Sequence, residues 1–287
     1  MLVPQSLLAL LLIASVEGCI YRRDEHGVAV STFSYTGTTG PLGWAHLSSS
    51  NGLCSNGTNQ SPIAISSSST PTLSGSALPV VTIPEVSAGE ALLENLGSTL
   101  EVVVNGTLKL DGVDEEYKMA QFHFHTPSEH RIDEEYFPLE MHMVFKSASG
   151  GVAVIGVPFD LSDSGNSTSL LTTVFAPIAS VASPGSEAPI SGALNFDDVL
   201  SAVQKGPLYS YSGSLTTPPC TQGVKWMVLG KPLDIDVKTY KTVKGVLKFN
   251  SRYTQNAPGE VNLVQYAGDG SLHRVVFRFR CFAPCIA

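Results

Sequence analysis

One segment, residues 117–126, combines a β-strand pattern with two histidines on the same side of the chain. It contains QFHFH at 121–125. Because side chains on a strand alternate between faces, Gln121, His123 and His125 share one face and the two phenylalanines take the other. The aromatic face predicts packing into a core, and the histidine face indicates two metal ligands held by a sheet. A half-buried strand whose histidines bond to backbone groups would show the same short pattern.

A second segment, residues 139–147, carries a third histidine with the same alternation. Glu140, His142 and Val144 share a face of this expected strand. Residues 126–138 between the two strands are turn-prone and long enough to bring the second strand beside the first. Three neutral imidazoles on adjacent strands would leave a tetrahedral Zn²⁺ with one open position, which is typical of catalytic rather than structural zinc.

Two of the expected ligands also have a polar neighbour two positions upstream. Gln121 precedes His123, and Glu140 precedes His142. Acceptors in such places fix the tautomer and the ring plane of a metal-binding histidine. Their presence favours a metal site over a strand whose histidines serve only the fold.

A different metal motif, HxHxxxE, also fits here, with Glu129 as a ligand as in the cupins. A cupin has glycines at set spacings around this motif, where this chain has Tyr117 and Tyr136. The second half of the cupin motif is missing near His142. The three-histidine site is therefore the favoured hypothesis.

The composition bounds the class of protein and its partners. The chain has 287 residues, of which 43% are hydrophobic and 15% charged, so a large core is expected. The formal net charge of −8 and the absence of a Lys/Arg run argue against nucleic acid and anionic membranes as partners. No apolar run approaches the ~20 residues that a membrane helix needs.

The N-terminus predicts secretion. Residues 1–18 contain a short apolar run followed by small residues at Val16 and Gly18, which is typical of a signal peptide. The remainder, 19–287, is expected to form one domain. Glycosylation sequons agree with an oxidising, extracellular setting; they begin at Asn56, Asn59, Asn105 and Asn166.

The cysteines lack metal-binding spacing and predict disulfides instead. There are five in the chain: Cys19, Cys54, Cys220, Cys281 and Cys285. An odd number after the signal peptide leaves one free, so a disulfide-linked homodimer is one hypothesis for the assembly.

Strand-like runs dominate the rest of the chain. They cover residues 99–110, 117–126, 139–147, 151–159, 224–230 and 273–280. Asn105 and Gly106 predict a hairpin turn. Helices are expected over 169–181 and 196–204, the latter capped by Asn195 or Asp197. The serine-rich stretches 66–76 and 180–191 are expected to be loops.

Several short motifs resemble the α-class carbonic anhydrases in sequence and order. They are QSPIAI (60–65), QFHFH (121–125), SEH (128–130), LEMHMV (139–144), GVAVIGV (151–157), GSLTTPP (213–219), VKWMVL (224–229) and FNSR (249–252). The resemblance extends from about Tyr35 to Arg252. It implies a single β-dominated, mainly antiparallel domain, built on a large central twisted sheet with a few short peripheral helices.

The resemblance also implies an activity and a set of roles. It implies reversible hydration of CO₂ to bicarbonate and a proton by zinc-bound hydroxide, with one Zn²⁺ per chain on His123, His125 and His142. Thr216 would accept a hydrogen bond from the hydroxide and donate its own proton to Glu129. With its only donor committed, the Thr216 oxygen can only accept, which orients the nucleophile. Ester hydrolysis would be a minor side activity.

Further residues take their roles from the same resemblance. Asn250 would support the ligands from outside, and a disulfide would join Cys54 to Cys220. The CO₂ pocket would have an apolar wall with one polar residue; its members are Val144, Val154, Leu215, Thr217, Val224 and Trp226.

Two departures from the family pattern bear on proton release and on packing. The best enzymes of the family carry a proton-transfer histidine in the segment aligned with residues 94–102, but this chain has Asn-Leu-Gly-Ser at 95–98. We expect proton export to depend on buffer or on another group such as His26. Thr126 stands where the family often has tryptophan.

A non-catalytic relative that only binds or adheres is the competing hypothesis. Such a protein is expected to have lost at least one site residue. Here the three histidines, Glu129 and Thr216 are all present, which favours the enzyme.

Overall fold

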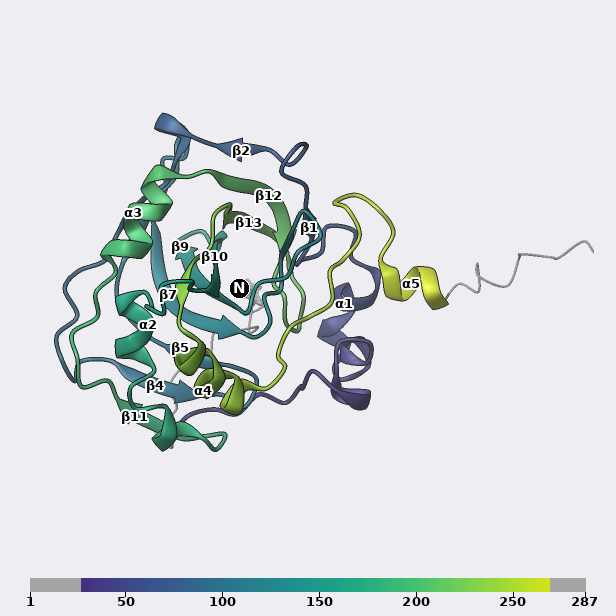
Figure 1. The fold of residues 1–287 in the computed structure, drawn as a ribbon. Coiled ribbons are helices and arrows are strands. Elements are labelled where there is room, and N and C mark those ends of the chain that lie inside the picture. Colours follow the sequence, from purple (N-terminus) through teal and green to yellow (C-terminus); the bar gives the residue numbers. More distant parts are fainter. Residues whose placement is uncertain (1–26, 269–287) are drawn as a thin grey trace, which may run out of the picture.

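The histidine-bearing strands lie in the middle of a large mixed β-sheet (Figure 1). The computed structural model describes residues 27–268. Within them, 12 strands form one sheet in the order β11-β4-β5-β7-β9-β10-β13-β12-β2, with β3, β6 and β14 paired at its margins. Most pairs are antiparallel, and β10 pairs in parallel with β13 and β14. The prediction of a mainly antiparallel, β-dominated fold is confirmed.

The bounds of the strands follow the chain order. They are β1 Ala64–Ile65, β2 Thr72–Leu73, β3 Val80–Thr82, β4 Leu92–Asn95, β5 Leu100–Val102, β6 Thr107–Lys109, β7 Tyr117–His125, β8 Arg131–Ile132, β9 Leu139–Ser147, β10 Val152–Leu161, β11 Glu187–Pro189, β12 Leu208–Ser214, β13 Gln222–Leu229 and β14 Leu233–Ile235. β1 and β8 form a separate parallel pair.

Short helices lie around the periphery of the sheet (Figure 1). They are α1 Leu53–Asn56, α2 Ser169–Val174, α3 Asp197–Lys205, α4 Val237–Leu247 and α5 Leu263–Gly268. Turns of 3₁₀ helix cover Gly37–Thr39, Trp44–His46, Ser49–Asn51, Gly75–Ala77 and Ile178–Val181.

The helix expected over 169–181 is divided in two. Its first part is α2, and a 3₁₀ turn follows at Ile178–Val181. Pro177 between them has no backbone N–H and cannot continue an α-helix. The other predicted helix is confirmed as α3, where Asn195 Oδ1 accepts the N–H of Asp197 at 2.7 Å.

Helix α4 was not expected from the sequence. Its Val and Thr residues have modest helix propensity and obscure the pattern. Asp236 starts it, because the Asp236 side chain accepts from the N–H groups of Lys238 and Thr239 at 2.9 Å.

The hairpin predicted at Asn105 and Gly106 is wrong. β5 and β6 both pair antiparallel with β7, so they run in line rather than back on one another. Gly106 lies at the break, where its carbonyl accepts the Met119 N–H at 2.9 Å. A Cβ at this position would come within 3.2 Å of Met119 Cβ, so the Gly permits a close backbone approach rather than a turn.

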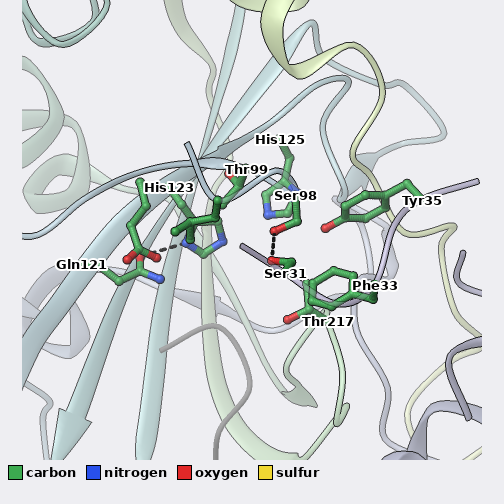
Figure 2. A pocket seen from close by; sticks show the side chains of 11 residues that line it. Ser31, Phe33, Tyr35, Ser98, Thr99, Gln121, His123, His125 and Thr217 are labelled. Carbon is green, nitrogen blue, oxygen red and sulfur yellow. Dashed lines mark hydrogen bonds between the residues drawn. The ribbon is translucent and has the colours of Figure 1, made fainter. Parts of the chain in front are cut away.

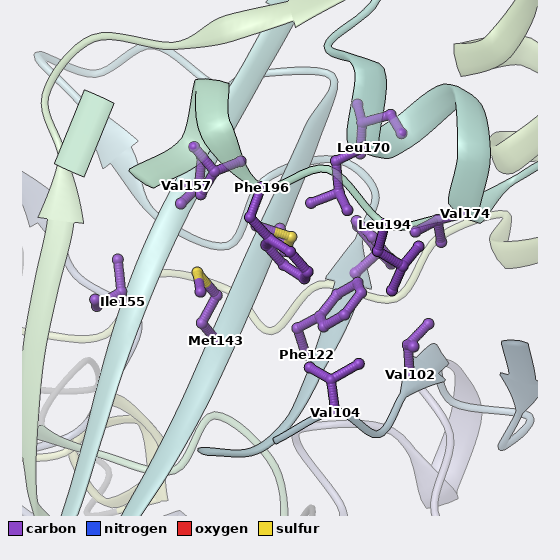
Figure 3. Close-up of a cluster of buried hydrophobic side chains, with 14 of the residues drawn as sticks. Val102, Val104, Phe122, Met143, Ile155, Val157, Leu170, Val174, Leu194 and Phe196 are labelled. Carbon is purple, nitrogen blue, oxygen red and sulfur yellow. The ribbon is translucent and has the colours of Figure 1, made fainter. Parts of the chain in front are cut away.

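The aromatic face of β7 packs into the main core, as the alternation predicted (Figure 3). Phe122 and Phe124 are fully buried. Phe122 meets the ring of Phe196 edge-on at 5.6 Å, and Phe124 meets Phe175 at 4.7 Å. Burial of such side chains contributes about 1.5–3 kcal/mol each. The opposite, histidine-bearing face is therefore held from behind by the core.

Some expectations fall outside the described residues. They are the signal peptide at 1–18 and the strand at 273–280. Within residues 27–268, no helix is long and apolar enough to cross a membrane.

Candidate metal centre

The histidine faces of β7 and β9 meet at one point of the sheet. The two strands are antiparallel and place His123 directly opposite His142. The ring centroids lie 5.0 Å (His123–His125), 5.2 Å (His123–His142) and 4.6 Å (His125–His142) apart. One nitrogen from each ring lies within 4.8 Å of the others, and all three side chains are buried. The predicted ligand set is thus assembled by the fold.

The outer nitrogen of each ring is engaged by a hydrogen bond. The pairs are His123 Nδ1 with Gln121 Oε1 (2.8 Å), His142 Nε2 with Glu140 Oε1 (2.9 Å) and His125 Nδ1 with the Asn250 backbone carbonyl (2.7 Å). Because these acceptors take the ring N–H, each inner nitrogen keeps its lone pair for a ligand. The sequence had pointed to Gln121 and Glu140, and the Asn250 carbonyl completes the set (Figure 2 shows the Gln121–His123 bond).

The inner side of the site fits a metal ion. His125 Nε2 is buried and has no hydrogen-bond partner among the described residues. Burial lowers the pKa of His125 to about 4, and burial with the neighbouring rings lowers the pKa of His123 well below its usual value. Neutral imidazoles are the form that binds metal, and three nitrogens suit Zn²⁺.

Glu140 links the histidine ligands to the segment between β7 and β9. Its Oε2 accepts the N–H groups of Glu129 and His130 at 2.8 and 2.9 Å, and its Oε1 accepts from the His130 and His142 rings. Burial would raise the pKa of Glu140, but the two histidines outweigh it and hold this pKa well below its usual value. Glu140 is thus a charged acceptor with no exposure to solvent.

Glu129 and Thr216 lie next to the ligands. Glu129 Oε1 accepts the Arg252 N–H at 2.8 Å, and its Oε2 lies 3.6 Å from His125 Nε2. Burial raises the pKa of Glu129 to about 7, opposed by His142, by the Arg252 N–H and by the Thr216 side chain. Within residues 27–268, two groups of side chains lie close enough to share an ion: His123, His125 and His142, and His130, Glu140 and His142. Glu129 belongs to neither group, so the cupin-type ligand set is not formed.

The expected apolar wall forms a second, smaller core cluster. All five apolar members are buried in it: Val144, Val154, Leu215, Val224 and Trp226. The Trp226 ring lies 4.8 Å from the His142 ring, centroid to centroid. Thr217 instead lines a pocket with His123 and His125 (Figure 2).

That pocket contains residues that sequence reasoning missed. Ser31, Phe33 and Tyr35 reach it from the N-terminal segment, and Glu101 reaches it from β5. Glu101 pairs with His123 in the sheet, and burial, helped by Glu94, raises its pKa to about 8. The alternation of β5 offered a signal for Glu101, because this residue is the charged member of an otherwise apolar strand.

Comparison with known proteins identifies the family. The model of the eukaryotic-type carbonic anhydrase family matches residues 39–265. The chain belongs to this family.

Relatives and solved structures agree with the assignment. A carbonic anhydrase of Pectobacterium carotovorum is 33% identical over 240 residues, covering 80% of this chain and 89% of the relative. The fungal α-carbonic anhydrase of Aspergillus oryzae is 42% identical with a TM-score of 0.78, covering 83% of this chain and 99% of that chain. The Thermovibrio ammonificans α-carbonic anhydrase, solved with the inhibitor sulfanilamide, is 32% identical with a TM-score of 0.68, covering 78% and 95%. The expected carbonic anhydrase enzyme is thereby confirmed.

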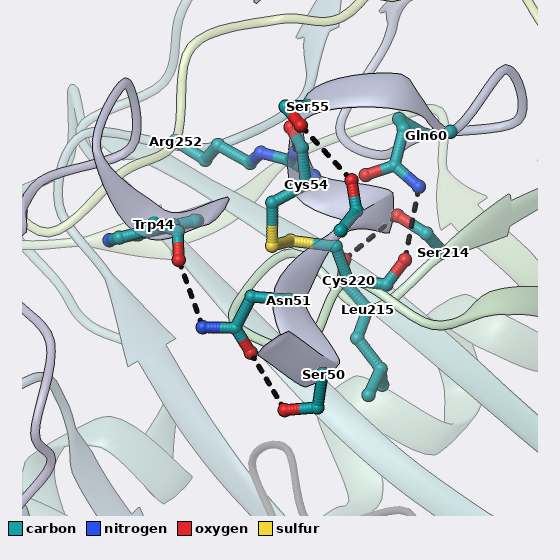
Figure 4. Close-up of a disulfide and its surroundings, with 12 residues drawn as sticks. Trp44, Ser50, Asn51, Cys54, Ser55, Gln60, Ser214, Leu215, Cys220 and Arg252 are labelled. Carbon is teal, nitrogen blue, oxygen red and sulfur yellow. Dashed lines mark hydrogen bonds between the residues drawn. A yellow bond between two sulfur atoms is a disulfide. The ribbon is translucent and has the colours of Figure 1, made fainter. Parts of the chain in front are cut away.

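The disulfide implied by the family resemblance is present (Figure 4). Cys54 and Cys220 are bonded, with their Cα atoms 5.1 Å apart. The Cys220 carbonyl also accepts from Gln60 Nε2 at 3.0 Å, and Leu215 N–H donates to Thr221 at 2.9 Å. The loop that carries Thr216 is therefore fixed at several points.

Two expectations about this carbonic anhydrase concern residues that the structure does not describe. Cys19, Cys281 and Cys285 lie outside residues 27–268, so the free-cysteine dimer stays a prediction. His26 lies outside them as well. Ser98, in the segment without histidine, has its hydroxyl 2.6 Å from that of Ser31.

Proposed function

We propose that this carbonic anhydrase hydrates CO₂ reversibly with one Zn²⁺ held by His123, His125 and His142. The observation that carries the proposal is the convergence of three buried ring nitrogens, one from each histidine. The other nitrogen of each ring is already hydrogen-bonded to an acceptor. When bound, such an ion acts as a Lewis acid that makes water a usable nucleophile near neutral pH.

The chain's own residues orient and enclose the reaction. Gln121, Glu140 and the Asn250 carbonyl hold the ligand rings in one tautomer and one plane. Thr216, donating to Glu129, keeps only acceptor capacity and so directs the nucleophile. CO₂ is apolar and would lie against the buried cluster that contains Val144 and Trp226.

We also propose secretion, with residues 1–18 removed and 19–287 forming the mature protein. The Cys54–Cys220 disulfide supports this, because such bonds persist in oxidising compartments. Minor ester hydrolysis, glycans on the exposed sequons and a disulfide-linked dimer through a free cysteine belong to the same proposal.

The test pairs zinc content with CO₂ hydration in wild type and His125→Ala. The variant should lose both zinc and activity, because the two remaining histidines are too few protein ligands to hold the ion. His46→Ala, at an exposed histidine in the 3₁₀ turn Trp44–His46, is the matched control and should keep both. Full zinc content in His125→Ala would refute the ligand set.

A further inference from the structure

An N-terminal segment crosses the pocket of the metal centre. Residues 28–35, called the strap below, place Ser31, Phe33 and Tyr35 in the lining shared with His123 and His125 (Figure 2). The strap is not part of the sheet, and its position depends on contacts at its two ends.

The first end rests on the turn between β4 and β5. Ser31 N–H donates to the Leu96 carbonyl at 2.9 Å, and the hydroxyls of Ser31 and Ser98 are 2.6 Å apart. Val30 packs against Gly97, where an added Cβ would lie 3.1 Å from Val30 Cγ1. Gly97 has φ +76°, a conformation that a residue with a side chain adopts rarely. This turn is therefore shaped to receive the strap.

The second end is anchored by half-buried aromatic rings that pack on the buried Trp44. Phe33 and Tyr35 meet the ring of Trp44 edge-on, at 5.4 and 5.7 Å. Trp44 is fully buried beside the disulfide, and its Nε1 donates to the Ser34 carbonyl at 3.0 Å. Because packing of two aromatic rings on a buried tryptophan contributes more free energy than the two neutral hydrogen bonds of Ser31, the Ser31 end is the weaker one.

The strap leaves little free space over the histidines. The space between these side chains that a water-sized sphere can reach measures about 10 Å³. That is close to the minimum for one water molecule, and an aromatic ring cannot enter it. A linear triatomic molecule needs only a small fluctuation of the lining, whereas a ring needs the strap to move.

We propose that the strap, latched by the Ser31–Ser98 hydrogen bond, selects ligands of the metal centre by size. CO₂, bicarbonate and water pass with the latch closed, and aryl esters and aryl sulfonamides enter only when the Ser31 end lifts. Ser31 and Ser98 are thus specificity-determining residues that act by holding the strap. The inference rests on the proposed function, since it concerns access to that same centre.

The size of the effect follows from the latch. A neutral hydrogen bond contributes about 0.5–1.5 kcal/mol, so its loss should raise the open population about 2- to 10-fold. A ligand that binds only the open form gains apparent affinity in proportion to that population.

The first test uses the zinc-loaded full chain as wild type, Ser31→Ala, Ser98→Ala and Thr32→Ala. Sulfanilamide affinity by calorimetry and kcat/KM for 4-nitrophenyl acetate should both rise about 2- to 10-fold in the two latch variants. CO₂ hydration should stay within about 2-fold. Thr32 is exposed in the same strap, so Thr32→Ala should match wild type. The double variant should equal either single one, because both remove the same bond.

A second test measures the opening of the strap without an activity assay. Amide hydrogen exchange at Ser31, whose N–H is bonded to Leu96, should speed up in Ser98→Ala and not in Thr32→Ala. Unchanged exchange with unchanged sulfanilamide affinity would overturn the latch, as would ester hydrolysis and CO₂ hydration rising together. A wild type that binds zinc but hydrates no CO₂ would instead overturn the proposed function, and the inference with it.

Discussion

The residues around the metal centre reach it in two ways. The three histidines come from β7 and β9, which are neighbours in the sheet with their pairing recorded over the length of both strands. Thr216 and Asn250 come from loops, and Asn250 meets His125 across 125 residues of sequence. The strands are held by the backbone hydrogen bonds of the sheet and by a packed core, whereas the loops are held by a disulfide and separate hydrogen bonds.

This difference indicates a division of labour. Strand contacts place the nitrogens that would hold the ion, and loop contacts place the groups that would orient the reaction. Damage to the strand side should therefore remove metal, whereas damage to the loop side should slow the chemistry and leave the metal bound. Substitutions on each side should therefore separate metal content from turnover.

Glu140→Ala should cause the largest loss. It removes one buried charge that accepts four hydrogen bonds, and leaves those donors without a partner. Breaking a buried charged network of this kind costs about 3–5 kcal/mol, and loss of an outer partner weakens metal binding about 10- to 100-fold. Urea unfolding and zinc titration measure the two effects.

The control for this prediction is Glu135→Ala, at an exposed glutamate in the connection that leads into β9. It should change neither quantity. Wild-type zinc affinity in Glu140→Ala would show that the ring orientations do not depend on this carboxylate.

Removal of the disulfide should separate the two regions most clearly. Cys54→Ala with Cys220→Ala should lower the free energy of unfolding by about 2–4 kcal/mol, since the bond closes a long loop. The Thr216 loop loses an anchor, so kcat for CO₂ hydration should fall while zinc content stays at one per chain. Elemental analysis beside stopped-flow hydration checks this. Loss of zinc in step with activity would contradict the separation.

The same division explains what the sequence could predict. The period-2 alternation of β7 and β9 is local, so it was enough to propose the histidine ligands with Gln121 and Glu140. The position of Thr216 depends on contacts between distant segments, and only the family resemblance supplied it. The Asn105–Gly106 hairpin failed for a related reason, because a local turn signal cannot show that β5 and β6 share one partner strand.

Asn250→Ala should give a smaller effect than the disulfide. The Asn250 side chain accepts from Thr126 N–H at 2.7 Å and donates to the carbonyls of Ser98 and Phe124 at 2.9 and 2.8 Å. Losing these bonds should cost about 2 kcal/mol of unfolding free energy. The Asn250 carbonyl that holds His125 remains, so zinc affinity should fall less than in Glu140→Ala.

The matched control is Asn256→Ala, whose side chain makes two exposed hydrogen bonds: it donates to the Val261 carbonyl at 3.1 Å and accepts the Ala257 N–H at 3.3 Å. It should lose no more than about 0.5 kcal/mol. A zinc affinity in Asn250→Ala as low as in Glu140→Ala would place Asn250 with the strand-borne group instead.

The pH dependence of stability should reveal the titration of Glu101, a residue of β5 that pairs with His123 in the sheet. Burial, helped by Glu94, raises its pKa from 4.5 to about 8. Between these values the folded chain binds one more proton than the unfolded chain, so this group's contribution to stability is complete below pH 4.5 and is lost as pH rises through 8. The slope from this one group is at most about 1.4 kcal/mol per pH unit. The free energy of unfolding of the metal-free protein is measured in urea from pH 5 to pH 8. It should fall less steeply with pH in Glu101→Gln than in wild type or in the control Glu85→Gln, which alters an exposed carboxyl. Parallel curves for the three chains would mean that Glu101 is already ionised in the fold, and that the strand side carries a buried negative charge beside the ligands.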